Sequence, residues 1–354
     1  MGRRPFRSSP AQTQRPSVMA SAAGPSQGKY TENMKWGILG HGLIAPQFIK
    51  SLTAIPTQQL FAIGSRSNAT DLATRYPDVR VYDTYEALCK DEEVDVIYVS
   101  TPHNFHREHT LLALSHGKHV VCEKPMGISA DEVKEMQAMA SKEKRFLMEG
   151  MWTRFLPAYR KAMEELHAGI IGKCRWLQAD FSFYAPYEPE KRWLNPALAG
   201  GSVYDVGVYP IAMAMDLFGN TPEHIQAQAN MAGTGVDAHC SIQLQYKEGP
   251  SAQLFSGIDV ETPHMAQIGG AQGSMQLPSF WKASSYKTSL EGELKEYAFP
   301  YVRTGYYHEI IAAIECIEAG LLECPIFSFE DSLRMAEIVD EVLKQIGYPD
   351  VSRS

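Results

Sequence analysis

The segment Trp36-Gly37-Ile38-Leu39-Gly40-His41-Gly42-Leu43-Ile44-Ala45 decides the fold of this chain. Its apolar start predicts a buried strand, and the Gly-x-Gly-x-x-Ala pattern that follows leads into a helical stretch. Gly40 permits a tight turn, Gly42 lets the backbone approach a diphosphate, and Ala45 lets the helix pack closely on the strand. The free amides at the helix start, around Leu43 and Ile44, suit an anion. The segment therefore indicates a dinucleotide-binding turn rather than a glycine-rich turn alone.

The pattern after this turn alternates short apolar runs with longer amphipathic stretches, which is the rhythm of a parallel sheet. We expect strands at Trp36–Leu39, Leu60–Ser65, Val94–Ser100, His119–Glu123 and Phe146–Glu149. We expect helices at Ala45–Thr53, Ala69–Tyr76, His106–His116 and Ala130–Lys142. The sequence predicts an α/β Rossmann domain over residues 34–150.

Composition limits the function classes that remain open. The chain has 354 residues, enough for two domains, and a formal net charge of −8, which argues against nucleic acid or an anionic membrane as the main partner. No apolar run reaches the roughly 18 residues of a membrane-spanning helix. The six cysteines form no C-x-x-C pair, as expected in a reducing, cytoplasmic compartment.

The first 33 residues differ from the rest of the chain. They are rich in serine, proline and arginine, and they contain no acidic residue before Glu32. They lack the apolar run of a secretory signal. This bias fits either an organelle-targeting segment or a disordered extension.

The end of the second strand selects the cofactor. NAD-binding sites usually carry an acid there, which binds the ribose 2′-hydroxyl. This chain instead reads Ser65-Arg66-Ser67, and an arginine can pair with a 2′-phosphate. We expect NADP rather than NAD, with a solvated surface arginine as the alternative for Arg66.

Two further motifs carry a family resemblance. The chain reads Cys122-Glu123-Lys124-Pro125 after one strand and Ser100-Thr101-Pro102-His103-Asn104-Phe105-His106 after the preceding strand. With the glycine turn, these resemble the Gfo/Idh/MocA oxidoreductase family over residues 34–347. Residues 146–155 and 199–209 look most similar to the branch that contains dimeric dihydrodiol dehydrogenases, NADP-dependent D-xylose 1-dehydrogenases and glucose–fructose oxidoreductase.

The resemblance implies a second, α+β domain over residues 151–347, with an open, mostly antiparallel sheet that forms a homodimer contact. The sequence supports such a sheet, with strand-like runs at Val236–Lys247, Ser251–Asp259 and Met265–Gly269. Helical patterns return at Tyr306–Ala319 and Asp331–Ile346, the second of which packs back on the first domain in the family. Residues 348–354 are expected to be a tail.

The resemblance also implies the catalytic residues. Oxidation of an alcohol by hydride transfer needs a group that takes the hydroxyl proton. The family places the lysine of its Glu-Lys-Pro motif, here Lys124, in the active site, with a cis bond before Pro125. In this branch a tyrosine, here Tyr209, acts as acid/base, and a nearby cation is expected to lower its pKa. Asp205 shares a helix face with Tyr209 and is expected to orient Lys124 or the substrate; a helix N-cap is its alternative role.

The remaining site predictions concern the cofactor and the mouth of the cleft. Trp152 and Arg154, just after the last Rossmann strand, are expected to reach the nicotinamide or substrate, with a packing pair at the hinge as the alternative. We expect Arg192 and Trp193 at the cleft mouth, and we expect no metal site at His103, His106 and His109. The expected cofactor-binding residues are Gly40, Gly42, Leu43, Ile44, Ser65, Arg66, Ser100, Thr101, Pro102, Asn104, His106, Glu123, Lys124, Trp152 and Arg154.

The resemblance implies an NADP-dependent dehydrogenase whose substrate is a trans-dihydrodiol or an aldopyranose such as D-xylose. Two alternatives stay open. One is a non-catalytic NADP-binding regulator, and the other is an enzyme that holds its cofactor tightly and shuttles hydride between two sugars.

Overall fold

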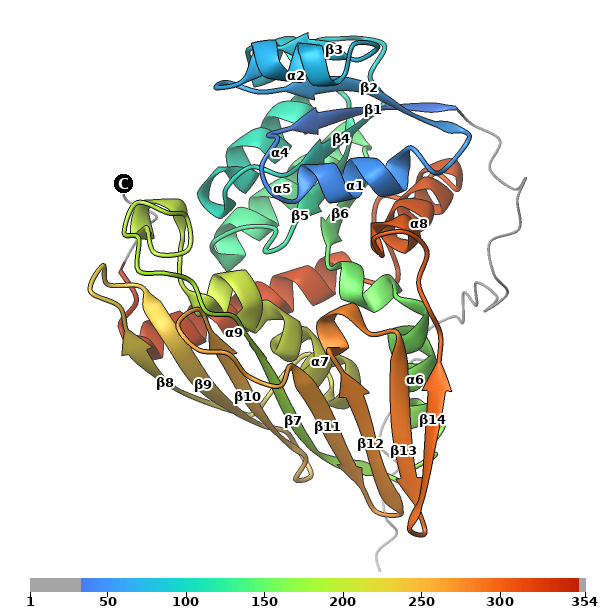
Figure 1. The fold of residues 1–354 in the computed structure, drawn as a ribbon, viewed down its shortest axis with the longest axis vertical. Helices are drawn as coiled ribbons and strands as arrows, with labels where there is room; N and C mark the ends of the chain where they lie inside the picture. Colours follow the sequence, from blue (N-terminus) through green and yellow to red (C-terminus); the bar gives the residue numbers. More distant parts are fainter. Residues whose placement is uncertain (1–32, 350–354) are drawn as a thin grey trace, which may run out of the picture.

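A computed structural model describes residues 33–349 of the chain, so the expectations for residues 1–32 and 350–354 lie outside it. The described residues form two sheets, one above the other in Figure 1. The first sheet has six parallel strands in the order β3-β2-β1-β4-β5-β6. They are β1 (Met34–Leu39), β2 (Gln58–Gly64), β3 (Arg80–Tyr82), β4 (Val96–Val99), β5 (His119–Glu123) and β6 (Leu147–Gly150).

Helices cover both faces of this sheet, as the Rossmann arrangement requires. They are α1 (Ala45–Leu52), α2 (Ala69–Arg75), α3 (Tyr85–Cys89), α4 (His106–Ser115) and α5 (Ala130–Glu143). The strands are buried on both sides, which explains their continuous apolar sequence. In the core, Phe48 of α1 stacks on Tyr98 of β4, with ring centroids 3.6 Å apart.

The second sheet has eight strands in the order β14-β13-β12-β11-β7-β10-β9-β8. All neighbouring pairs are antiparallel except β7 and β10. The strands are β7 (Cys174–Ser182), β8 (His224–Met231), β9 (Asp237–Gln245), β10 (Ser251–Gly257), β11 (Met265–Gly270), β12 (Gly273–Pro278), β13 (Ser285–Leu290) and β14 (Glu293–Ala298). Helices α6 (Pro157–His167), α7 (Val208–Phe218) and α9 (Phe329–Ile346) pack on this sheet.

The end of the chain returns to the first domain. Helix α8 (Tyr306–Glu318) packs on α1, where the Ser51 and Thr304 hydroxyl oxygens lie 2.7 Å apart. Helix α9 packs on α5, and the Asp340 carboxylate accepts the Ala130 N–H at 2.9 Å. The prediction that the last helix packs back on the first domain is confirmed, and α8 does the same.

The expected fold class, a Rossmann domain with an α+β C-terminal domain, is confirmed. The sequence patterns missed β3 and α3, which are only three and five residues long, and much of the second sheet. Strand β8 was not predicted because two of its four half-buried positions, Ala227 and Ala229, are alanine. The alternation of apolar and polar residues in this strand is therefore weak. Among residues 33–349, no helix has the length and apolar character that crossing a bilayer requires.

Candidate functional site

The glycine turn has room for a ligand. Gly40 has a φ of +85°, and a Cβ there would lie 2.9 Å from the Thr101 side chain, so the turn needs glycine. A Cβ on Gly42 would meet no atom within 4 Å. Leu43 is 76% exposed and Ile44 is 39% exposed, although both are apolar. The turn thus combines open space with uncovered apolar side chains and a helix start that no side chain caps.

At the end of β2, Arg66 is exposed and lies between two aromatic rings. Its guanidinium carbon is 5.3 Å from the ring centroids of both Tyr85 and Phe105. Ser65 is buried, and its hydroxyl donates to the Asn68 side-chain oxygen. The two rings hold the guanidinium at the edge of the sheet where the glycine turn lies.

The loop after β4 packs beneath the glycine turn. The Ser100 hydroxyl donates to the Gly40 carbonyl at 2.8 Å, and the buried Asn104 Oδ1 has no hydrogen-bond partner within the described residues. Pro102 immediately precedes the 3₁₀ turn His103–Phe105, which leads into α4. This loop therefore shapes the turn and leaves one buried acceptor unused.

Two of the residues expected to bind the cofactor use their side-chain polar atoms within the fold. The ring nitrogens of His106 lie 2.7 Å from the Pro125 carbonyl and 2.8 Å from the Thr101 carbonyl. The Thr101 hydroxyl is 2.9 Å from His109 Nδ1. His106 thus bridges the loops after β4 and β5, and Thr101 uses its hydroxyl inside the fold.

The three histidines predicted not to bind a metal have different partners. His103 Nδ1 lies 3.1 Å from the Ala199 carbonyl, and the His103 ring contacts the His106 ring edge to face. Within residues 33–349 no group of three or more histidine, cysteine or acidic side chains is arranged to hold a metal ion.

Lys124 and Asp205 join the two domains at the carboxyl end of β5. Lys124 Nζ donates to the Asp205 carbonyl at 2.5 Å and lies 3.7 Å from the Asp205 carboxylate. Arg192 binds the same carboxylate through two nitrogens, at 3.0 and 3.2 Å. Burial acts to raise the pKa of Asp205, but Arg192 and Lys124 outweigh it and bring the pKa to about 2. Asp205 is therefore a buried anion that orients Lys124. The peptide bond between Lys124 and Pro125 is cis.

Asp205 is not a helix cap. It lies within a π-helical turn, Val203–Gly207, that runs into α7, and Gly207 is the residue that precedes that helix. The alternative of an N-cap role is wrong because the carboxylate is bound by two cations instead. π-Helical turns are rare in proteins, and those that do occur are often found at functional sites.

Tyr209 lies beside Lys124, at the start of α7. Lys124 Nζ is 4.9 Å from the centroid of the Tyr209 ring, and Trp152 Nε1 donates to the Tyr209 hydroxyl at 3.2 Å. Burial raises the pKa of Tyr209 well above 10, and the charge of Glu123 acts in the same direction. The expectation that a nearby cation lowers this pKa is wrong, because burial and the carboxylates dominate. Tyr209 is a neutral phenol in this structure.

An aromatic wall extends from Tyr209. Phe181 stacks on Trp281 with centroids 4.4 Å apart, and Trp152 stacks on Tyr306 with centroids 5.1 Å apart. The Tyr209 ring is 5.3 Å from the Phe181 ring. The sequence analysis did not find Trp281 or Tyr306. Gly305, directly before Tyr306, has a φ of +92°, and a Cβ there would lie 2.4 Å from the Trp152 ring, so only the structure explains this glycine.

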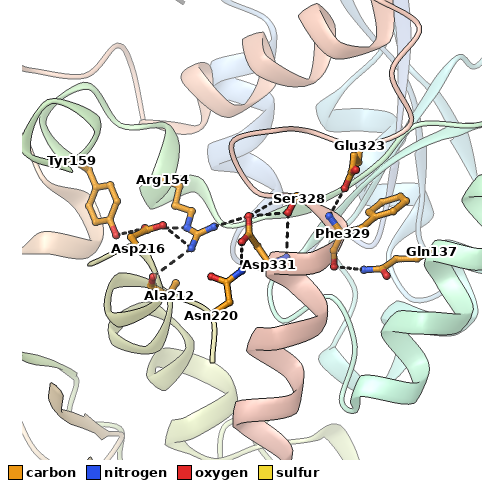
Figure 2. Close-up of polar contacts among 10 residues, drawn as sticks. All are labelled: Gln137, Arg154, Tyr159, Ala212, Asp216, Asn220, Glu323, Ser328, Phe329 and Asp331. Carbon is orange, nitrogen blue, oxygen red and sulfur yellow. Dashed lines mark hydrogen bonds and ion pairs between the residues drawn. The ribbon is translucent and has the colours of Figure 1, made fainter. Parts of the chain in front are cut away.

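Arg154 does not face the cleft. Figure 2 shows its guanidinium between two carboxylates, 2.7 Å from Asp216 and 3.5 Å from Asp331. It also lies 4.3 Å from the centroid of the Phe327 ring. The prediction that Arg154 reaches the cofactor is wrong, because its charged end is bound within a buried network that joins α7 to α9. The alternative of a packing role at the hinge fits its contacts.

Trp193 is in a packing role. It packs against a small apolar cluster formed by Leu194, Val236 and Ile258, unlike its neighbour Arg192. The predicted pair at the cleft mouth therefore separates into one residue that binds Asp205 and one that packs.

Two buried carboxyl groups lie under the site. Glu123 accepts from the Tyr98 hydroxyl and from the Lys124 N–H. Glu309 of α8 is fully buried, and neither of its oxygens has a hydrogen-bond partner within the described residues. Burial, followed by the charge of Glu123, raises the pKa of Glu309 well above its usual value. Burial also raises the pKa of Glu123, but the Tyr98 hydroxyl and the charge of Lys124 oppose that rise. Glu309 has no donor, so it is the member of the pair that keeps a proton more readily.

Comparison with known proteins identifies the class of molecule that has this fold and site. Residues 34–151 match the model of an oxidoreductase family with an NAD-binding Rossmann fold, and residues 159–276 match the GFO/IDH/MocA C-terminal domain. The chain therefore belongs to the Gfo/Idh/MocA oxidoreductase family.

Several individual proteins and solved structures are also similar to this chain. The chain is 35% identical to trans-1,2-dihydrobenzene-1,2-diol dehydrogenase of Mus musculus, over 89% of this chain and 97% of that protein. It is 34% identical to the Homo sapiens protein of the same name, with the same coverage. KijD10, a 3-ketoreductase from Actinomadura kijaniata solved with NADP and TDP-benzene, has a TM-score of 0.81 and 26% identity, over 89% of this chain and 98% of that one. An aldose–aldose oxidoreductase from Caulobacter crescentus has a TM-score of 0.79 and 25% identity, over 89% and 97%.

Glu309→Gln tests whether Glu309 keeps its proton. Because the pKa of Glu309 is raised in the folded state, the native protein keeps a proton that the unfolded chain releases above about pH 4.3. The stability of the wild-type protein should therefore fall relative to that of the variant as the pH rises from 4 to 8, with a limiting slope of about 1.4 kcal/mol per pH unit. Urea unfolding at several pH values measures this difference. Parallel curves for the two proteins would contradict it, and Glu92→Gln, at an exposed position, is the control.

Proposed function

We propose that this chain is an NADP-dependent dehydrogenase that acts on a trans-dihydrodiol or an aldopyranose. The convergence of Lys124 and Tyr209 carries the proposal. Lys124 follows β5 of the first sheet and Tyr209 begins α7, which packs on the second sheet, and they meet where parallel strands end, 4.9 Å apart from Nζ to ring centroid. Ligands of open α/β sheets bind at this edge.

The chain has a suitable cradle for a dinucleotide. The open space at Gly42 suits a diphosphate, and the exposed side chains of Leu43 and Ile44 suit its apolar parts. The unused acceptor of Asn104 suits a polar group of the ligand. The exposed Arg66 suits a 2′-phosphate, which favours NADP over NAD. A bound nicotinamide supplies the hydride donor or acceptor.

Tyr209 is the proposed proton donor for the carbonyl oxygen, and Lys124 the proposed source of positive charge beside it. A neutral phenol suits the carbonyl-reducing direction, in which it donates its proton. Asp205 acts through Lys124, because it fixes Nζ with its carbonyl and its carboxylate. This arrangement favours an enzyme over a non-catalytic regulator.

The substrate class rests on the aromatic wall and on the relatives. Flat rings such as Trp281 and Phe181 present apolar area to the ring of a dihydrodiol or the apolar face of a pyranose. The names of the relatives at 34–35% identity favour the dihydrodiol, and the aldose–aldose oxidoreductase keeps sugars open. The same relative also supports the alternative of an enzyme that holds its cofactor tightly and transfers hydride between two sugars.

The second sheet is the proposed homodimer contact. One row of the sheet places a glutamine on each of six neighbouring strands. Four of the six are exposed and two are half-buried. In strand order from β8 to β12, the row is Gln226, Gln243, Gln253, Gln178, Gln267 and Gln276. Glutamine amides donate and accept at once, so this surface is complementary to a second copy of itself.

Tyr209→Phe should lower turnover by about a hundredfold or more, since it removes the proposed acid/base group. The affinity for NADPH, measured by fluorescence titration, should stay within about twofold, because the ring remains. Tyr246→Phe, at another buried tyrosine directly after β9, is the matched control and should leave turnover unchanged. Near-normal turnover in Tyr209→Phe would remove Tyr209 from the mechanism.

Arg66→Ala should lower kcat/KM for NADP by about tenfold or more and leave the value for NAD nearly unchanged. The reason is the loss of one charge-assisted contact to a 2′-phosphate. Arg75→Ala, on the adjacent α2, is the control. Equal efficiency of the wild-type protein with NAD and NADP would refute the cofactor assignment.

Light scattering should give twice the 39.4 kDa chain mass for the wild-type protein. Gln253→Glu, in the middle of the row, should favour the monomer because like charges would face each other across the contact. Gln59→Glu, exposed on the first sheet, should remain dimeric. A monomeric wild-type protein would contradict the proposed contact.

A further inference from the structure

The segment that carries Asp205 is held from beneath by the second sheet. The Asp237 carboxylate, on β9, accepts from the Val203 N–H at 2.8 Å and from the Ser202 hydroxyl at 2.7 Å. The Ser202 oxygen also lies 2.8 Å from Ser256 Oγ, on β10. All three polar side chains are fully buried. Buried polar groups with these bonds fix one local conformation, because every alternative leaves a group unpaired.

These contacts hold the π-turn at both ends. Asp237 and Ser202 hold its start at Val203, and a Cβ on Gly207, at its end, would lie 3.2 Å from Ser256 Oγ. The turn thus has little freedom to shift along α7. Because Lys124 Nζ binds the carbonyl of Asp205 inside this turn, a shift of the turn would displace the ammonium.

The approach of Asp237 also explains a glycine. Gly201 has a φ of +103°, and a Cβ there would lie 2.1 Å from Asp237 Oδ1, an atom that has no hydrogen-bond partner within the described residues. Burial raises the pKa of Asp237 to about 6, against the bonds from Ser202 and Val203. Burial of an ionised Asp237 is therefore electrostatically unfavourable, and its contribution to the fold is the two hydrogen bonds that Oδ2 accepts.

We propose that Asp237, Ser202 and Ser256 form a buried polar anchor that positions Asp205, and through it Lys124, for the reaction. This inference rests on the proposed function. Asp237 touches neither Lys124 nor Tyr209, so it is a positioning residue. Its proposed contribution is the geometry of the turn rather than its negative charge. An asparagine at this position would also have a side-chain oxygen to accept from the Val203 N–H, so it should keep that geometry.

Two substitutions of Asp237 distinguish the loss of the hydrogen-bond acceptor from the loss of the negative charge. Asp237→Leu removes the acceptor, and Asp237→Asn keeps an oxygen toward Val203. We expect kcat to fall about tenfold or more in Asp237→Leu, because small displacements of catalytic groups have effects of this size. KM and the NADPH dissociation constant should stay within about twofold. Asp237→Asn should restore kcat to within about threefold of wild type.

Hydrogen exchange gives a readout that does not depend on turnover. In Asp237→Leu, the peptide that covers residues 203–209 should exchange at least about tenfold faster, as expected for a turn that has lost its anchor. Thr288→Val, another fully buried side chain in the same sheet, is the control and should leave this peptide unchanged. Should Asp237→Leu fail to fold, Ser256→Ala removes one bond of the anchor and should show smaller changes in the same direction.

Unchanged exchange in a folded Asp237→Leu would overturn the anchor. Faster exchange with an unchanged kcat would overturn its role in the reaction. A wild-type protein without turnover on diols and sugars would count against the proposed function alone, because the exchange comparison is made without substrate.

Discussion

The contact of Lys124 with Asp205 is the interaction on which the site depends. It joins the end of β5 in the first domain to the π-turn before α7 in the second domain, through a hydrogen bond of 2.5 Å to the Asp205 carbonyl and an ion pair. A buried ammonium and a buried carboxylate each lose solvation, and each is tolerated because the other is present. Arg192 adds the second cation that keeps Asp205 ionised. The position of Tyr209, four residues further on, follows from the same turn.

The parts of the site that were predictable from the sequence are local. The glycine turn and the Lys124-Pro125 motif each occupy a few consecutive residues directly after a strand, so their place at the sheet edge follows from the strand. The Rossmann strands were found for a similar reason, because burial on both faces leaves long apolar runs. β3 and α3 were missed, since three to five residues carry no measurable period.

The rest depends on contacts between distant segments. Trp281 and Tyr306 are more than 100 residues beyond Trp152, and only the folded chain shows that their rings meet. Arg154 was misassigned because its distance from a strand end is a poor guide to the direction of its side chain; two carboxylates on α7 and α9 decide that direction (Figure 2). The pKa of Tyr209 was expected to fall because Lys124 was visible in the sequence, whereas the burial that raises it was not.

The return of α8 and α9 to the first domain has a consequence for modularity. The segment from Tyr306 onward packs on α1 and α5 and supplies the Tyr306 ring of the aromatic wall, so the nucleotide-binding module consists of two stretches separated by the whole second sheet. Recombination between relatives at a single crossover near Gly150 would pair the α8 and α9 of one parent with the α1 and α5 of the other. A functional chimaera needs a second junction before α8, so that the two ends of the chain are inherited together.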